Sequence, residues 1–264
     1  MTTLVTRRTP LVWLLVLFLG LPVAFFSAAF RHTANGFELG PYDLWRVVRY
    51  ICVPAAGFGV PFPCSSVHPE TANSPGYVIL PVTGDHILTV PTRRIIGIED
   101  PAAQSPESAI YWQAAWDARL QLRTDHGTAT DRSRFALAIN SAYARSQEQF
   151  HIHTACVQPD VKAILADESD RIGFDWTPLQ KRIKGWRFTA RKLDATDLKD
   201  VNVIALLPAD VRANRTVLSK QTLVVVGTTL ETGRPGFYVL NSESRRGDGG
   251  QGEALLDFNC PSDK

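Results

Sequence analysis

Two histidines separated by one residue are the side chains of this sequence best suited to carry out chemistry. His151 and His153 lie in the run Gln149–Cys156 (QFHIHTAC). Alternate side chains of a β-strand point to the same face, so Gln149, His151 and His153 should share one face while the residues between them pack inward. Imidazole, with a reference pKa of about 6.5, is mostly neutral at neutral pH and can act as a nucleophile or general base. The pattern favours such chemistry at one face of a strand.

The spacing of the histidines leaves three interpretations open: catalysis, a structural pair bonded to neighbouring groups, and a zinc pair. Strand parity disfavours a His-x-His-x-x-Cys metal site, because Cys156 should point away from both histidines. It equally disfavours Cys156 as the nucleophile of a Cys/His pair. If the site is catalytic, a diphosphate is a suitable substrate. An imidazole attacks one phosphorus atom, one phosphate leaves, and water later resolves the phosphoramidate.

Polar side chains near this strand carry the groups that a phosphoryl-transfer site needs, namely donors and positioning for the phosphate oxygens. The candidate substrate-binding residues are Asn140, Ser141, Arg145, Ser146, Gln149 and Arg94. His86, which begins a strand beside a turn, is interpreted as a surface residue.

The elements that must position these residues follow from local patterns. The run Phe135–Asn140 (FALAIN) is almost wholly apolar and predicts a strand buried on both faces. Ser105 begins a helix, since it is followed by a proline and an acid that favour a first turn, and Gly127 should end it. A short helix opens at Pro159. The other predicted strands are Gly76–Val82, His86–Val90, Gln149–Val157, Trp186–Lys192, Thr222–Thr228 and Gly236–Asn241. Together they predict an α/β (α+β) fold: an antiparallel sheet with helices on one face.

The chain divides into four parts. They are a cytoplasmic stub with a transmembrane anchor (1–31), an irregular linker (32–75), a catalytic unit (76–160) and a second, accessory or degenerate repeat unit (161–264). Phe135–Ser141 resembles Phe237–Ser242, and each is followed by a polar loop, an apolar strand and a cysteine, which suggests a duplication. Leu255 and Asp257 stand in the second copy where the first has histidines, so that copy would be catalytically silent.

The N-terminus carries a targeting signal. Leu11–Phe30 is a run of 20 residues without a charge, behind Arg7 and Arg8. Such a run spans roughly 30 Å as a helix, the hydrocarbon thickness of a bilayer. The arginines should stay in the cytoplasm, which places the remainder on the non-cytoplasmic side as a single-pass inner (plasma) membrane protein. The alternative is a cleaved signal peptide, since Ser27-Ala28-Ala29 offers small residues, but its apolar core would be unusually long.

The four cysteines agree with an exported domain, because an even number in such a chain suggests two disulfides. Three pairings are possible. Cys52 and Cys64 bracket a Pro-rich loop and form the natural local pair, which leaves Cys156 with Cys260.

The composition excludes two classes of protein. Hydrophobic residues at 45% and charged residues at 20% are ordinary for a globular chain and argue against general disorder. A net charge of +2, with no dense basic block, argues against a nucleic-acid partner.

The motifs around the histidines resemble a known superfamily. A buried strand ending in Asn140, a loop that bears Ser146 and the run Gln149–His153 are similar to the histidine-triad superfamily, in which a His-x-His-x-His strand carries the nucleophile at its middle histidine. The segment Ile87–Ile95 also looks like that superfamily's strand-to-proline-to-basic element.

A closer resemblance is to the CDP-diacylglycerol pyrophosphatase family. It rests on the N-terminal anchor, the Cys52/Cys64 pair, the segment Trp112–Arg119 and the His-Ile-His-x-x-Cys strand. The likeness covers most of the chain up to Cys156 and continues more loosely to Cys260. It implies a membrane hydrolase that splits the phosphoric anhydride of CDP-diacylglycerol into CMP and phosphatidate, with no required metal or other cofactor. It indicates a lipid substrate and a membrane as partners, and no oligomeric state.

The resemblance also implies roles for single residues. His151 matches the nucleophile, which would carry a cytidylyl group, and His153 matches the third histidine, which supports the site by hydrogen bonding. Asn140 and Ser146 match positions that hold the nucleotide and its phosphates. Gln149 stands where the first histidine would be; it donates a hydrogen bond but cannot pass a proton to the leaving group, which bears on the rate more than on the reaction. The alternatives are nucleotidyl transfer to a non-water acceptor and a silent, membrane-anchored nucleotide- or lipid-binding domain.

Overall fold

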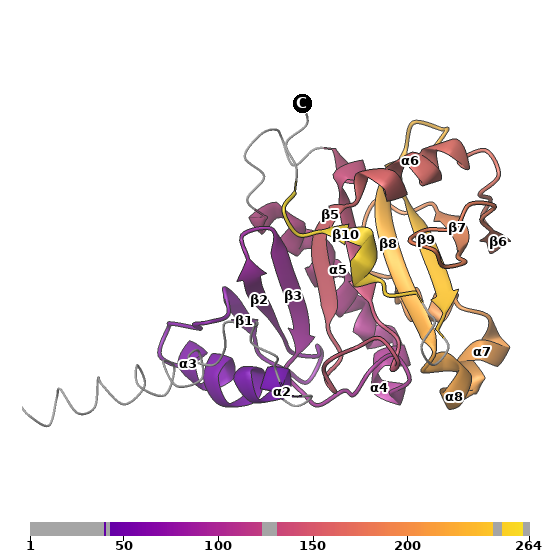
Figure 1. Ribbon diagram of the computed structural model, residues 1–264. Coiled ribbons are helices and arrows are strands. Elements are labelled where there is room, and N and C mark those ends of the chain that lie inside the picture. The colour runs from indigo at the N-terminus through magenta and orange to yellow at the C-terminus, as the bar shows by residue number, and fades with distance from the viewer. Residues whose placement is uncertain (1–39, 41–42, 123–130, 245–249, 261–264) are drawn as a thin grey trace, which may run out of the picture. The chain divides into compact units, whose positions relative to one another are not determined.

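A large antiparallel sheet organises the protein (Figure 1). The computed structural model describes residue 40 and residues 43–122, 131–244 and 250–260. The ten strands are β1 (Ser66–His68), β2 (Tyr77–Thr83), β3 (His86–Pro91), β4 (Phe135–Ile139), β5 (Ile152–Val157), β6 (Thr177–Pro178), β7 (Thr189–Leu193), β8 (Gln221–Thr229), β9 (Pro235–Glu243) and β10 (Leu256–Asp257). The helices are α2 (Asp43–Val47), α3 (Val53–Ala56), α4 (Pro101–Gln104), α5 (Ala109–Ala118), α6 (Pro159–Asp167), α7 (Ala209–Ala213) and α8 (Arg215–Leu218).

The predicted membrane anchor, Leu11–Phe30, lies outside the described residues, as does Gly127. Among the residues that the structure does describe, no helix combines the length and the apolar character needed to cross a bilayer.

Most predicted elements are confirmed with small shifts at their ends. The hairpin of β2 and β3 and the buried strand β4 lie where the apolar runs placed them. The helix expected from Ser105 is shorter than predicted, because a 3₁₀ turn precedes α5 and another follows it at Arg119–Gln121. The strand expected from Gln149 begins only at Ile152.

The central strands are covered on both faces, so the prediction of helices on one face alone was wrong. On one face, Trp112 of α5 packs in a cluster with Leu137 of β4. On the other, Val161 of α6 packs in a cluster with Ala136 of β4. A sheet whose middle strands are apolar on both sides must be covered twice, since each exposed face would leave apolar area in water.

The order of the strands is nearly palindromic. From β2 to β6 the sheet runs β2-β3-β5-β4-β8-β9-β7-β6, so two groups of four strands meet where β4 pairs with β8. In each group the chain forms the outermost strand first, then its neighbour, then the strand at the β4/β8 boundary, and last the strand between those two. This order overturns the specific alignment of Phe135–Ser141 with Phe237–Ser242, because β4 corresponds in position to β8 while β9 occupies the place of β5.

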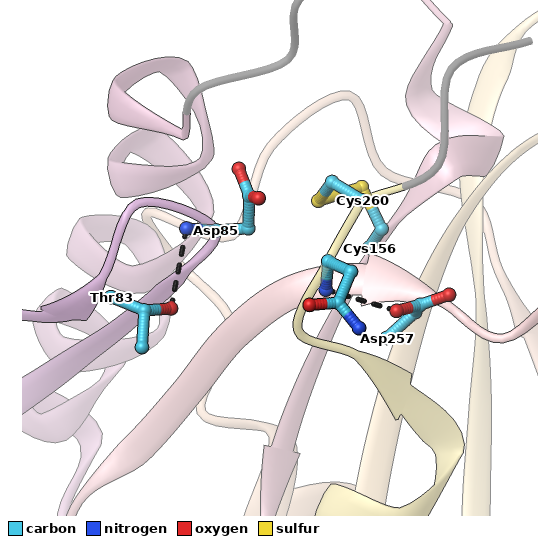
Figure 2. Close-up of a disulfide and its surroundings, with 6 residues drawn as sticks. Thr83, Asp85, Cys156, Asp257 and Cys260 are labelled. Carbon is cyan, nitrogen blue, oxygen red and sulfur yellow. Dashed lines mark hydrogen bonds between the residues drawn. A yellow bond between two sulfur atoms is a disulfide. The ribbon is translucent and has the colours of Figure 1, made fainter.

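Both predicted disulfides are confirmed. The disulfide between Cys52 and Cys64 closes a loop in the helical N-terminal segment. The apolar side of this segment covers Val78 and Leu88 of the first hairpin. Cys156 of β5 is bonded to Cys260, 104 residues further along the chain (Figure 2). Next to this bond β10 pairs with the end of β5, which holds the C-terminal segment against the middle of the sheet.

Candidate active site

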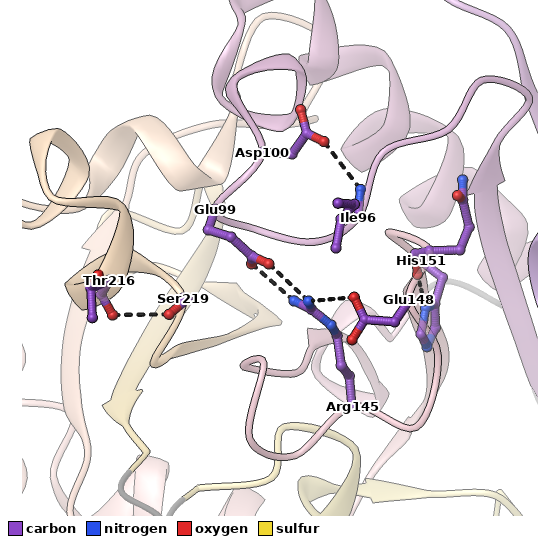
Figure 3. Close-up of polar contacts among 9 residues, drawn as sticks. Ile96, Glu99, Asp100, Arg145, Glu148, His151, Thr216 and Ser219 are labelled. Carbon is purple, nitrogen blue, oxygen red and sulfur yellow. Dashed lines mark hydrogen bonds and ion pairs between the residues drawn. The ribbon is translucent and has the colours of Figure 1, made fainter. Parts of the chain in front are cut away.

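The ring of His151 is held by a main-chain oxygen. Its Nδ1 lies 2.7 Å from the carbonyl oxygen of Gln149. A carbonyl only accepts hydrogen bonds, so Nδ1 carries the proton and the lone pair of the neutral ring is on Nε2. Figure 3 shows this contact beside the loop that follows β4. The arrangement gives His151 the tautomer that a nucleophilic Nε2 requires.

The backbone before β5 leaves the sheet for a specific reason. The buried amide of Gln149 donates to the carbonyl oxygens of Pro91 and Arg93, at 3.2 and 3.0 Å. The backbone N–H of Phe150 donates to the Ile95 oxygen at 2.6 Å. These three bonds replace ladder pairing, which is why the strand begins three residues later than predicted.

The predicted parity of the side chains is nevertheless confirmed. Phe150, Ile152 and Cys156 all belong to the apolar cluster on the α5 face. Thr154 donates to the Ala115 oxygen of α5. The rings of His151 and His153 are 4.7 Å apart, centre to centre. The two buried histidines therefore lie against each other, and Cys156, disulfide-bonded on the opposite face, is neither a ligand nor a nucleophile.

A third histidine joins this pair. Nε2 of His86 is 3.0 Å from Nδ1 of His153, and the two rings are parallel. Phe258 stacks on the other side of His86, with 4.0 Å between ring centres. His86 is only 8% exposed, so its interpretation as a surface residue was wrong. A local pattern cannot reveal this contact, because it depends on the pairing of β3 with β5 across more than sixty residues.

Glu253, which no motif indicated, completes the cluster from the C-terminal segment. Its Oε2 lies 3.5 Å from Nε2 of His153, a buried nitrogen with no hydrogen-bond partner in the described part of the chain. Asn140 fixes this segment, since its Oδ1 accepts from the backbone N–H of Gly252 at 2.8 Å. Asn140 directly follows β4, whose Ala138 pairs with His153 of β5.

Burial sets the charges of this cluster. Desolvation, helped by the neighbouring His151, lowers the pKa of His86 from 6.5 to about 4. Desolvation also lowers the pKa of His151, although the Gln149 carbonyl opposes the shift, and lowers the pKa of His153 well below its usual value. The same cause raises the pKa of the Glu253 carboxyl, which Asn140 partly opposes. Near neutral pH the three rings are therefore uncharged.

Arg145 is committed to an ion-pair network. Its Nη1 and Nη2 donate to the two carboxylate oxygens of Glu99 at 2.9 and 2.8 Å, and Nη2 also reaches Glu148 at 3.1 Å (Figure 3). Arg145 and Glu99 are both buried. Gly97 leaves the room for this pair, since a Cβ atom there would lie 2.0 Å from Nη1. The network holds the loop before His151 in place; direct binding of phosphate by Arg145 would compete with two carboxylates.

The remaining candidates lie at different depths. Ser141 is fully buried; its N–H donates to Thr222, and its Oγ has no partner in the described part of the chain. Ser146 is exposed on the loop. Arg94 lies over the ring of Trp45 at 6.0 Å. Among the described contacts, none joins Ser146 to the histidines.

Two further observations bear on what the site can hold. Within the described ranges, no group of three or more His, Cys, Asp or Glu side chains has the geometry of a metal site. A cavity of about 410 Å³ lies elsewhere, lined by residues of the second group of strands such as Phe188 and Asn241, and it contains none of the candidate residues.

Comparison with known proteins identifies the family of this chain. The profile of the family described as CDP-diacylglycerol pyrophosphatase matches residues 40–264, from the start of the described chain through the histidines to the C-terminus. A relative from Yersinia pestis, named CDP-diacylglycerol pyrophosphatase, is 30% identical over 222 residues, which is 82% of this chain and 83% of the relative. The chain belongs to the CDP-diacylglycerol pyrophosphatase family.

Proposed function

We propose that this chain has the activity for which its family is named, and that it hydrolyses CDP-diacylglycerol to CMP and phosphatidate through a nucleotidyl group carried on His151. The observation that carries the assignment of the nucleophile is the bond from Nδ1 of His151 to the Gln149 carbonyl. It directs the ring's lone pair to Nε2 and away from the backbone.

The reaction proceeds in two displacements. In the first, Nε2 of His151 attacks the phosphorus next to cytidine, an N–P bond forms, and the P–O bond to phosphatidate breaks. In the second, water attacks the same phosphorus and the N–P bond breaks, which releases CMP and restores the imidazole. The low pKa of His151 keeps this ring neutral and nucleophilic near neutral pH.

The loop after β4 supplies polar side chains with fixed positions. Asn140 Oδ1 accepts from the backbone N–H of Gly252, and the Asn140 side chain also bonds to the Glu253 carboxyl. Ser141 brings a buried hydroxyl without a partner among the described residues. A buried donor of this kind gains most from meeting a phosphate oxygen, because an unmet polar group in the interior costs about 1–3 kcal/mol.

The same proposal places the chain in the histidine-triad superfamily. The His-x-His pair on one strand and the bound tautomer of His151 support it. The palindromic strand order adds support, since two equivalent groups of strands, of which only the first carries histidines, are what a duplication with one silent copy would leave.

Membrane attachment is also part of the proposal. The apolar run Leu11–Phe30 anchors the chain in the inner membrane, with the enzyme on the non-cytoplasmic side, where its two disulfides are stable. Three apolar side chains near the start of the described residues are strongly exposed: Tyr50 at 70%, Phe58 at 88% and Val60 at 64%. Such a group of residues suits a site that works next to a lipid surface.

The covalent step is tested by trapping. The chain is incubated with CDP-diacylglycerol radiolabelled on the phosphorus next to cytidine and quenched in alkali, which preserves phosphohistidine-type adducts. We expect label on the peptide that contains His151, stable to alkali and lost in acid. His151→Ala should abolish both label and CMP, while replacement of the exposed His68 by Ala should change neither. Release of CMP by a folded His151→Ala variant would overturn the assignment.

The attachment is tested on the full chain in its membrane. The protein should stay with the bilayer through a high-salt and an alkaline wash. Its domain should be cleaved by protease added to the non-cytoplasmic side of sealed vesicles. Release by either wash, or protection from that protease, would contradict the anchored topology.

A further inference from the structure

The proposed reaction lacks a proton donor. Phosphatidate leaves with a new charge on its oxygen, and water must lose a proton in the second step. Gln149, at the position of the superfamily's first histidine, cannot carry a proton, and its amide is bonded to the carbonyls of Pro91 and Arg93. The three rings of the cluster are neutral near neutral pH, because burial lowers the pKa of each. No imidazolium is therefore available as the acid.

One acidic side chain stands at this cluster in the described part of the chain. The Oε2 of Glu253 is 3.5 Å from Nε2 of His153. Its side chain is 36% exposed, so it is reached by solvent as well as lying next to the ring of His153. The Arg145 guanidinium, whose charge acts on His151, has its Nη atoms bonded to Glu99 and Glu148. Among the charged groups described, Glu253 is thus the one in this cluster without an ionised partner.

The surroundings of Glu253 favour a proton on its carboxyl. The groups that face it are the neutral His153, then His86 and His151 behind it, the amide of Asn140 and the ring of Phe258 on His86. None of these is a cation near neutral pH. Burial raises the pKa of Glu253, and its hydrogen bond with Asn140 only partly offsets this. A carboxylic acid with a raised pKa is the form that general acids take at neutral pH.

Three independent features of the fold hold the carboxyl in place. The backbone N–H of Gly252, directly before it, donates to Asn140. The strand β10, which begins three residues after it, pairs with β5. The disulfide from Cys260 to Cys156 then fixes the end of the segment. A side chain one hundred residues away in sequence is thereby held beside His153 of β5.

On the basis of the proposed function, we propose that Glu253 is the general acid and base of the reaction. As the P–O bond breaks, the carboxyl proton of Glu253 moves to the bridging oxygen of phosphatidate while Nε2 of His151 forms the N–P bond. In the second step the Glu253 carboxylate takes a proton from water, the water oxygen attacks phosphorus, and the electron pair of the N–P bond returns to Nε2. The sum is one water consumed, with CMP and phosphatidate released and the enzyme regenerated.

The sharpest test varies the leaving group. The dinitrophenyl, nitrophenyl and phenyl esters of cytidine 5′-phosphate release progressively more basic phenolate anions. Only the more basic leaving groups need an acid. Glu253→Gln keeps the size of the side chain and removes the proton. We expect kcat on CDP-diacylglycerol to fall by about 10²-fold or more with little change in KM. The loss should be largest for the phenyl ester and smallest for the dinitrophenyl ester. In the pH profile of kcat, the alkaline limb of the parent enzyme should disappear in Glu253→Gln.

The control is Asp257→Asn, which removes the same charge four residues along the same segment. Asp257 Oδ1 accepts from the N–H of Asn259, and asparagine can still do so. This variant should keep its activity, its dependence on the leaving group and its alkaline limb. An equal loss by Glu253→Gln on all three esters, or no loss at all, would overturn the role of Glu253.

The failure of this inference can be told apart from the failure of the proposed function. If only Glu253 is assigned wrongly, the parent chain still forms CMP and the His151 adduct, and Glu253→Gln keeps its dependence on the leaving group. If the proposed function is wrong, the parent chain itself forms neither CMP nor adduct from CDP-diacylglycerol.

Discussion

The Nδ1 atom of His151 is bonded to the main-chain oxygen of the residue two positions before it, Gln149, at 2.7 Å. The carbonyl can serve this purpose because the Gln149 side chain ties the same residue to Pro91 and Arg93. In the proposed reaction Gln149 therefore acts through its backbone, by orienting the ring of His151.

Replacement of Gln149 by leucine tests this relationship. Leucine has a similar size but donates no hydrogen bond, so the two carbonyls lose their partner and the Gln149 oxygen loses its fixed position. We expect a loss of about 1–3 kcal/mol in the free energy of unfolding. We also expect kcat to fall by about 10-fold or more, as small misplacements of a reacting group are costly. Urea denaturation and steady-state kinetics measure the two effects, with the exposed Gln180→Leu as control. Full activity in Gln149→Leu would show that the ring needs no such support.

The buried histidines make stability depend on pH. The pKa of His86 is about 4 in the folded chain and 6.5 when unperturbed, so between these values the unfolded chain binds more protons. The contribution of His86 to the free energy of unfolding should therefore be fully present above about pH 6.5. It should be lost, by about 3 kcal/mol, as the pH drops toward 4. Urea denaturation across this window should show a shallower slope for His86→Gln than for the parent. Replacement of the exposed His68 by Gln should leave the slope unchanged, and an unchanged slope in His86→Gln would contradict the burial of this ring.

The two carboxylates on Arg145 should differ in their effect on stability. Glu99 is 8% exposed at its side chain and Glu148 is 37% exposed. Glu99→Gln removes the buried negative charge that pairs with the Arg145 guanidinium and should lower the free energy of unfolding by about 3–5 kcal/mol. Glu148→Gln loses an accessible, solvent-screened contact and should cost less than about 1 kcal/mol. Equal losses measured by urea denaturation would show that burial does not govern this network.

The two disulfides should separate stability from activity. Replacing both Cys156 and Cys260 by serine frees the end of the segment that carries Glu253, so Tm and kcat should both fall. Replacing Cys52 and Cys64 opens a loop with a separation of only 12 residues, away from the histidines. Tm should fall there too, by the equivalent of about 3 kcal/mol, while kcat on a soluble cytidylyl ester is retained. Equal kcat losses in the two double variants would argue against a specific role for the C-terminal segment.

Heavy-oxygen water identifies the phosphorus that is attacked. If His151 attacks the phosphorus next to cytidine, the oxygen that resolves the adduct appears in CMP and none appears in phosphatidate. Mass spectrometry of both products decides this. Label in phosphatidate would place the attack on the lipid side, and a new cytidylyl ester in place of CMP would show transfer to an acceptor other than water.

Much of the site was predictable because its signals are local. The alternation of Phe150, His151, Ile152 and His153 follows from the two-residue period of extended chain, and it holds even though the regular strand begins at Ile152. The hairpin of β2 and β3 likewise follows from two apolar runs around a turn. The disulfides followed from counting, since once Cys52 and Cys64 pair across a short loop one partner remains for Cys156.

Only the tertiary structure brought in His86 and Glu253 and committed Arg145 to Glu99. Each of these contacts joins residues far apart in the chain, and which of them meet depends on the order of the strands and on the return of the C-terminal segment. Composition and periodicity determine which face of a strand is buried, because that depends on the residues of that strand alone. They do not determine which buried polar groups meet, since that is settled by how the whole sheet packs. The sequence thus predicted the face that carries the two histidines, and the fold decided which groups lie against them and set their charge.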